Sequence, residues 1–77
     1  MNNDELKALL FAVINGQIAD AGLSHMEAAE ILKVKRPIIS KLKGCNYETF
    51  SVSKLIDYAV ALGVEVEIKI GRKRVKI

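Results

Sequence analysis

A chain of 77 residues that is 51% hydrophobic, only 5% aromatic and has a single proline fits one small, mostly helical domain, and excludes disorder and several domains. One cysteine and one histidine exclude an internal disulfide and a structural metal cluster, so no cofactor is expected and the reducing cytoplasm is the expected compartment. The net charge of +3 is uneven, because residues 1–30 hold one lysine and five acids whereas residues 31–77 hold eleven Lys/Arg and four acids.

A first helix is predicted over about residues 4–21. Asn3 or Asp4 can cap its start, and Gly22 can end it with Leu23 packing back. Its apolar positions recur at steps of three and four residues and are Leu6, Leu9, Leu10, Val13, Ile14 and Ile18. The segment opens with the acidic sequence MNNDELK, and no apolar run approaches the roughly 18 residues of a membrane span. Neither a signal peptide nor a membrane partner is therefore expected.

Two shorter helices are predicted over about residues 24–33 and 36–43. Ser24 and Glu27 have the spacing of a capping box at the start of the first. Pro37 is compatible only with the first turn of the second, because proline has no amide hydrogen to donate, and Gly44 is expected to end it. The residues expected to be buried in the first are Ala28, Ala29, Ile31 and Leu32. Two short helices joined by a tight turn have the spacing of a helix-turn-helix.

A fourth helix is predicted over about residues 52–62, followed by a strand over about residues 64–70. Ser51 can cap the helix and Gly63 can end it. The pattern then changes to a period of two, in which charged residues alternate with Val64, Val66, Ile68 and Ile70.

The predicted strand needs a partner, because an isolated strand leaves its backbone groups unpaired. The partner is either a hairpin arm, reached through Gly71 and Arg72, or the same strand of a second chain. We favour the second chain, which makes residues 71–77 a basic tail that lies on DNA phosphates or keeps the strand edge soluble. The dimerisation residues are then Val64, Val66, Ile68 and Ile70. The expected fold class is mainly α, a four-helix domain over residues 1–77 with one C-terminal strand that pairs across a dimer.

Residues 24–44, SHMEAAEILKVKRPIISKLKG, resemble the helix-turn-helix of the Xre family, which includes lambda-repressor-like and Cro-like proteins. The matching positions are Ala28, Ala29, Leu32, Val34, Pro37, Ile39, Ser40, Leu42 and Gly44. Residues 50–70, FSVSKLIDYAVALGVEVEIKI, are similar to the last helix and strand of HigA-like antitoxins and their solitary relatives. The resemblance implies a lambda-repressor-like fold and a double-stranded DNA partner.

The sequence departs from the Xre pattern at four positions. Lys33 stands where the family usually has a glycine in a left-handed turn, and Lys35 stands where it has a capping serine. His25 and Arg36 replace glutamines. Lys35 is a poor cap and a cation at the positive end of a helix, each unfavourable by up to about 1 kcal/mol. We interpret Lys33 and Lys35 as an exchange of stability for affinity towards phosphate.

The predicted DNA-binding surface lies on the helix at residues 36–43. Ile39 and Leu42 lie three residues apart and must point into the core. The side chains left outside or at the flanks of this helix are predicted to bind DNA, together with Lys35 just before it and His25 at the start of the preceding helix. The full predicted set is His25, Lys35, Arg36, Pro37, Ile38, Ser40, Lys41 and Lys43.

The individual roles within this set are hypotheses. Arg36 either reads a guanine, which we favour, or holds a phosphate. Lys41 is expected to reach a base edge or the backbone, and Ser40 and Lys43 are expected to bind phosphate. Ile38 either touches a thymine methyl group or packs against the core. His25 donates to phosphate, braces Arg36, or is an ordinary residue at a helix start. For every cation the simpler interpretation is a solvated face. Tyr47, in the loop that follows, either binds a phosphate or packs.

The sequence thus predicts a transcriptional regulator, a repressor or autorepressor that binds an inverted-repeat operator as a homodimer. The first alternative is an antitoxin that also binds a toxin protein, which the resemblance of residues 50–70 suggests. The second alternative is a protein-interaction module that does not bind DNA. An enzyme is not expected, because no acid–base groups converge on a site.

Overall fold

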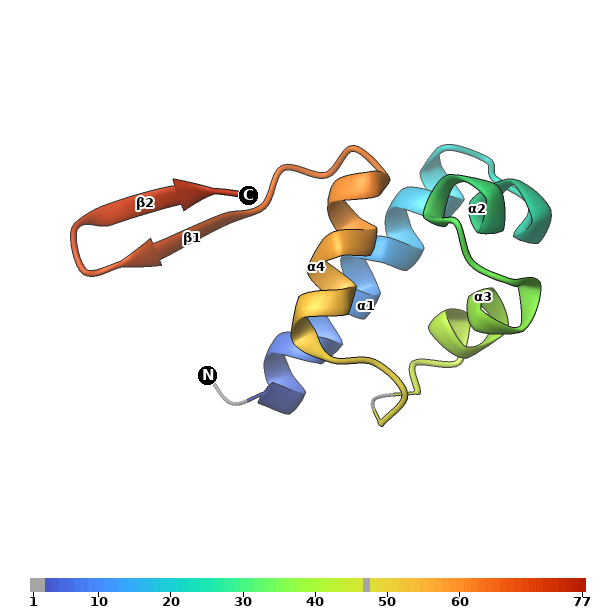
Figure 1. The fold of residues 1–77 in the computed structure, drawn as a ribbon, viewed down its shortest axis with the longest axis horizontal. Helices are drawn as coiled ribbons and strands as arrows, with labels where there is room; N and C mark the ends of the chain where they lie inside the picture. Colours follow the sequence, from blue (N-terminus) through green and yellow to red (C-terminus); the bar gives the residue numbers. More distant parts are fainter. Residues whose placement is uncertain (1–2, 47) are drawn as a thin grey trace.

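The computed structural model describes residues 3–46 and 48–77, which form four α-helices and two β-strands (Figure 1). The helices are α1 (Asn3–Asp20), α2 (His25–Leu32), α3 (Arg36–Lys43) and α4 (Val52–Ala61). The strands are β1 (Glu67–Ile70) and β2 (Lys73–Lys76). The predicted mainly α fold is confirmed, and each helix begins and ends within one residue of its predicted bounds.

Capping side chains set the helix starts where the sequence predicts them. The Glu27 amide donates to Ser24 Oγ over 3.1 Å, and the Ser24 amide donates to Glu27 Oε1 over 3.0 Å, which completes the capping box of α2. Ser51 Oγ accepts from the Lys54 amide in the same way at the start of α4. At the end of α1, Gly22 has φ +66°, as a helix-ending glycine requires.

The core joins all four helices. Its fully buried side chains include Phe11, Ile14 and Ile18 of α1, and they meet Ile39, Leu42 and Leu55 from α3 and α4. α1 packs along α4, while α2 and α3 pack together. Phe50, just before α4, lies edge-to-face with both Phe11 and Tyr58, with ring centroids 5.9 Å apart in each pair. Ile31, expected in the core, is 41% exposed instead, because α2 turns that side away from the other helices.

The structure also bears on membrane spans. Within residues 3–46 and 48–77, no single helix is long and apolar enough to cross a membrane; α1 and α2 pass that test only as a pair, with a bend of 120° at their break.

The prediction of one C-terminal strand that pairs with a second chain is corrected. β1 pairs antiparallel with β2 of the same chain, in the register Ile68 opposite Val75 and Ile70 opposite Lys73. Gly71, with φ +58°, makes the tight turn between them. The expected basic tail is therefore a strand. The predicted strand also begins later, at Glu67, since Val64 and Val66 lie in the connection from α4 and are half-buried against the core.

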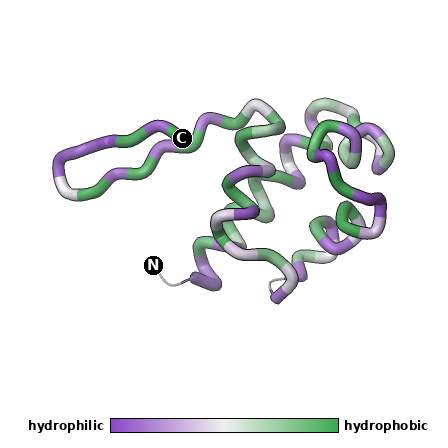
Figure 2. Tube along the Cα trace, in the orientation of Figure 1, coloured by the Kyte–Doolittle hydropathy of each residue, from purple (hydrophilic) through white to green (hydrophobic). Residues whose placement is uncertain are grey.

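The hairpin has one mostly aliphatic and one charged face. Hydrophobic and hydrophilic residues alternate along β1 in Figure 2. The residue pairing puts the aliphatic side chains on one face, and these are Val66, Ile68, Ile70, Val75 and Ile77. Lys73, opposite Ile70, lies on the same face next to the turn. On the other face Arg74 pairs with Glu67 and Lys76 with Glu65, each at 3.6 Å. Opposite charges across the two strands favour this register. The hairpin projects from one end of the molecule, while α2 and α3 lie at the other (Figure 1).

Candidate nucleic-acid interface

The turn between α2 and α3 is tight because Lys33 adopts a left-handed conformation. Its φ of 58° and ψ of 44° are those at which a glycine is usually found. The Val34 amide then donates to the Ala29 carbonyl over 3.0 Å, which satisfies an orphan carbonyl at the end of α2. The sequence comparison with the Xre pattern had identified this position, and the structure confirms its geometry.

α3 presents a basic face because two of its side chains are fixed in the core. Ile39 and Leu42 are fully buried, and Ile38 is half-buried at their flank. The predicted outward residues are all exposed, namely Arg36, Pro37, Ser40, Lys41 and Lys43. The structure thereby brings this part of the predicted site together on one helix, whereas contact of these residues with DNA remains a prediction.

The start of α3 carries positive charge and lacks a capping side chain. Lys35 is the N-cap residue, and its side chain makes no cap hydrogen bond. Arg36 and Pro37 follow, with no acid in the first turn. The start of α2 differs, because the Ser24 hydroxyl and the Glu27 carboxylate each accept a hydrogen bond from the other residue's amide. The Ser24 amide, and then its hydroxyl group, hold the pKa of the Glu27 carboxyl below its ordinary value. The helix dipole and two cations therefore reinforce one another at α3, where an anionic group such as a phosphate would be stabilised.

His25 opens α2 and is half-buried. Within residues 3–46 and 48–77 no hydrogen bond joins its ring to Arg36, and a role in bracing Arg36 stays a prediction. Donation from the ring to phosphate stays a prediction. Tyr47 lies outside the described residues.

Asn15 of α1 is a residue that the sequence reasoning missed. Its Nδ2 donates to the Leu42 carbonyl over 3.1 Å and lies 3.9 Å from Cys45 Sγ. This bond attaches the last turn of α3 to α1. The available signal was its spacing, since Asn15 lies four residues after Phe11 and beside Ile14, at the border of the buried stripe of α1.

α3 ends where the sequence predicts, because Gly44 follows its last residue as the C-cap. Gly44 has an ordinary helical φ of −79°, and Cys45 after it takes the left-handed conformation with φ 53°. The Asn46 amide then donates to the Lys41 carbonyl over 3.2 Å and closes the helix.

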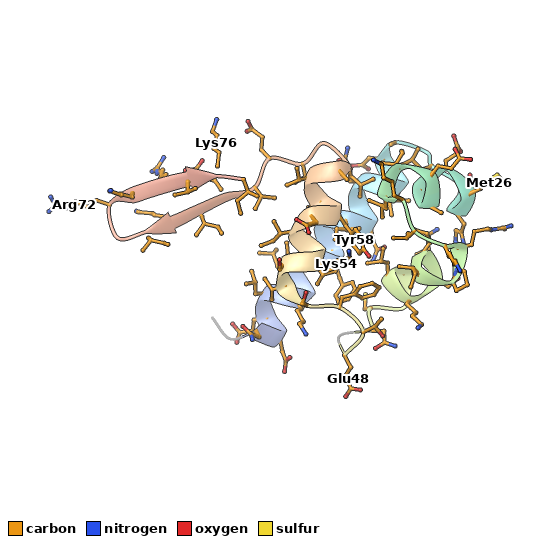
Figure 3. All side chains as sticks on the ribbon, viewed as in Figure 1. Met26, Glu48, Lys54, Tyr58, Arg72 and Lys76 are labelled. Carbon is orange, nitrogen blue, oxygen red and sulfur yellow. The ribbon has the colours of Figure 1, made fainter. Side chains whose placement is uncertain are left out.

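The basic hairpin does not extend the α3 surface within one chain. Arg72 lies at the tip of the hairpin and Lys76 along it, at the opposite end of the molecule from Met26 of α2 (Figure 3). One copy therefore cannot place this hairpin and α3 side by side on the same stretch of DNA.

Comparisons with known proteins agree with this geometry. A family model for a helix-turn-helix domain matches residues 2–71. A solved structure named "Putative XRE Family Transcriptional Regulator" aligns with a TM-score of 0.86 and 35% sequence identity, covering 92% of this chain and 80% of that one. Among curated proteins, none matches significantly. The two likenesses include the α2–α3 unit, α4 and β1.

Proposed function

The chain belongs to the Xre family of helix-turn-helix proteins and is a DNA-binding transcriptional regulator, and we propose that it represses transcription as a homodimer on an inverted-repeat operator. The observation that supports this most is the exposed basic face of α3, held outward by Ile39 and Leu42 in the core. We expect the cytoplasm to be its compartment, because a transcriptional regulator acts on promoter DNA. The proposal includes no catalytic step.

In the proposed complex α3 lies in the major groove. Arg36, in the first turn, faces the base edges, where a guanidinium can donate two hydrogen bonds to guanine O6 and N7. Lys41 lies five positions further along and reaches a base edge or the backbone. Lys35 and Lys43 lie at the two ends of the helix, and both bind phosphates. Ser40, within the helix, also binds a phosphate. Pro37 and Ile38 offer apolar contact to a thymine methyl group.

Repression follows from occupation of the promoter by a dimer. In a two-fold symmetric dimer two α3 helices read half-sites about 34 Å apart, one helical turn of DNA, or a multiple of it. The predicted dimerisation residues Val64, Val66, Ile68 and Ile70 lie in the connection from α4 and on the apolar face of β1. Ile68 and Ile70 are exposed in the single chain, which is the state expected of residues that a partner covers.

The antitoxin function is a second candidate, favoured by the same exposed apolar face. A toxin would compete with a second copy for this surface. A neighbouring gene for a small basic ribonuclease-like protein supports this function, and co-purification of that protein with the chain tests it. The protein-interaction module is distinguished by DNA binding itself, because such a module would not bind DNA selectively.

Selection of bound sequences from a random DNA pool tests the main proposal. We expect an inverted-repeat consensus with half-site centres about one helical turn, or a multiple, apart. Retention of a labelled operator against excess competitor DNA should then fall steeply with salt. A pool that yields no consensus, or a consensus without two-fold symmetry, would contradict the proposal.

A further inference from the structure

An open apolar groove lies between the helical body and the base of the hairpin. Its volume is about 600 Å³, and α1, α4 and residues 64–69 line it. The side chains that make it apolar include Leu6, Leu9, Val13, Ile56, Val66 and, from the hairpin itself, Ile68. Leu9 is 53% exposed although it lies on the apolar stripe of α1. The groove is thus a continuation of the core that this chain leaves uncovered.

The hairpin exposes a second apolar surface next to the groove. Ile70 is 70% exposed and Val75 is 52% exposed, and both lie on the aliphatic face of the hairpin. A two-stranded hairpin is marginally stable by itself in water, so this face needs apolar cover. The chain therefore carries a projecting apolar arm and an uncovered apolar groove.

If the proposed half-sites are one helical turn apart, their spacing locates the two-fold axis. For half-sites about 34 Å apart each α3 lies about 17 Å from the axis. The molecule is 40 Å long, with α3 towards one end and the hairpin at the other (Figure 1). With its long axis along the DNA, the two-fold axis passes near the middle of the molecule, beside α1 and α4. The hairpin must then extend beyond the axis, over the second copy.

Charge complementarity favours the same arrangement. Residues 68–77 contain five Lys/Arg and no acid, and three of these cations, Lys69, Arg72 and Lys73, lie outside the ion pairs with Glu65 and Glu67. The first turn of α1, next to the groove residues Leu6 and Leu9, carries Asp4 and Glu5, and Glu48 lines the adjoining surface with them. A hairpin tip that passes beyond the groove of another copy thus meets acidic groups.

We propose that in the homodimer the hairpin of each copy crosses the two-fold axis and lays its apolar face in the α1–α4 groove of the other copy. The inference rests on the proposed dimeric function and specifies its interface. Two identical contacts then form, each made of one hairpin and one groove. The faces of the hairpins join the copies, instead of the strand edges.

A complementation experiment on the full chain tests this arrangement. Leu9→Glu damages the groove and Ile70→Glu damages the hairpin, and both side chains are exposed, so the fold should survive, which circular dichroism and thermal unfolding verify. Met26→Glu is the matched control, because Met26 is 54% exposed on α2, away from both surfaces. Sedimentation equilibrium gives the dimer dissociation constant of each protein and of an equimolar mixture of the two damaged variants.

The reciprocal geometry predicts a distinct result for the mixture. Each damaged variant has two defective contacts in its homodimer, and at about tenfold per contact its dissociation constant should rise about 100-fold. The mixed dimer gathers both changes in one contact and keeps the other intact. Because a contact already broken by one carboxylate loses little more from the second, the mixed dimer should form about tenfold more tightly than either damaged homodimer. Met26→Glu should dimerise like wild type.

The possible failures are separable. If wild type is a dimer but Leu9→Glu leaves its dissociation constant unchanged, the groove is not the interface. The same holds if the mixture dimerises no better than its components, or if Met26→Glu weakens the dimer as much as Leu9→Glu does. Each of these results overturns the exchange of hairpins while the dimeric regulator stands. A wild-type protein that is monomeric both free and on its operator overturns the proposed dimer as well.

Discussion

Asn15 Nδ2 donates to the Leu42 carbonyl over 3.1 Å, a bond between α1 and the last turn of α3. The acceptor belongs to a helix end, where carbonyl groups have no partner within the helix. This bond therefore holds the orientation of the proposed recognition helix relative to the body of the domain. Asn15 Oδ1 is buried and has no hydrogen-bond partner among the described residues, so the side chain is retained at some cost in free energy.

Asn15→Ala should lower both stability and affinity for the selected operator. Loss of the bond and of side-chain contacts should reduce the free energy of unfolding by about 1 kcal/mol, measured by urea denaturation. Asn15→Asp should cost more, because it places a carboxylate oxygen against the Leu42 carbonyl, with no donor between them. Gln17→Ala, at a half-buried position of the same helix, is the control and should change stability by less than about 0.5 kcal/mol. Equal effects at both positions would show that Asn15 has no particular role.

Lys33→Gly should stabilise the protein and weaken its binding to DNA. A non-glycine residue in the left-handed conformation costs about 1 kcal/mol, which glycine avoids, so the urea midpoint should rise. Loss of the cation should reduce operator affinity and lower the slope of affinity against salt by about one unit. Lys33→Ala separates the two effects, because it removes the charge and keeps the backbone strain. An unchanged salt dependence in both variants would show that Lys33 does not meet phosphate.

Lys35→Ser should restore the missing cap of α3. A serine at this position can accept a hydrogen bond from a first-turn amide and removes a cation from the positive end of the helix, which together should raise the free energy of unfolding by about 1 kcal/mol. Operator affinity should fall at the same time if Lys35 binds phosphate. Ser51→Ala gives the reference for a cap in this domain and should cost about 1 kcal/mol without altering DNA binding. If Lys35→Ser gains stability and keeps full operator affinity, Lys35 does not bind phosphate and its side chain is only solvated.

The helices could be predicted from sequence because their signals are local. Ser24 with Glu27, Pro37 and Gly63 each mark a helix boundary within a few residues of the bonds that they make or prevent. The choice of strand partner is not local in this sense. The segment after Gly71 opens with three consecutive cations and alternates only from Val75 to Ile77, so its dense positive charge resembles that of a flexible tail. Only the cross-strand pairs of opposite charge, which need both strands in place, identify it as β2.

The candidate site could be predicted from sequence because the buried positions of α3 could be predicted. Once Ile39 and Leu42 are placed in the core, helix geometry fixes which side chains remain outside. Asn15 was missed because its partner is a backbone carbonyl, which leaves no trace in the side-chain pattern of α3. The left-handed conformation of Cys45 was not predicted, because few residues other than glycine adopt it.

The capping box should make stability depend on pH in the acid range. The Ser24 amide, and then its hydroxyl group, hold the pKa of Glu27 below the ordinary value of 4.5, so the unfolded chain binds the proton more readily than the folded one. The contribution to stability is therefore complete above that value and is lost as the pH falls through the lower pKa of the folded state. Glu27→Gln keeps a capping side chain without the titration. The stability difference between wild type and this variant should be constant near neutral pH and shrink in acid.

Ser24→Ala is the control for that measurement. It removes the Ser24 hydroxyl group, the second cause of the lowered Glu27 pKa, so the acid-dependent part of the stability should become smaller than in wild type. The amide bond from Ser24 to the carboxylate can persist in this variant, so a reduced effect is expected instead of its complete loss. A difference between wild type and Glu27→Gln that stays constant down to the acid transition would contradict the assignment.

Arg36→Ala and Lys43→Ala should affect DNA binding in different ways. Arg36 lies at the start of α3 and faces outward, where it is proposed to read a base, so its loss should cost about 1–3 kcal/mol at particular base pairs and relax the preference there. Lys43, in the last turn of the same helix, is proposed to bind phosphate. Its loss should weaken all sequences alike and lower the salt slope by about one unit. Titration of the operator and of single-base variants, each at several salt concentrations, separates the two effects. If both variants lose affinity equally on every sequence, Arg36 holds the backbone and the bases are read from elsewhere on α3.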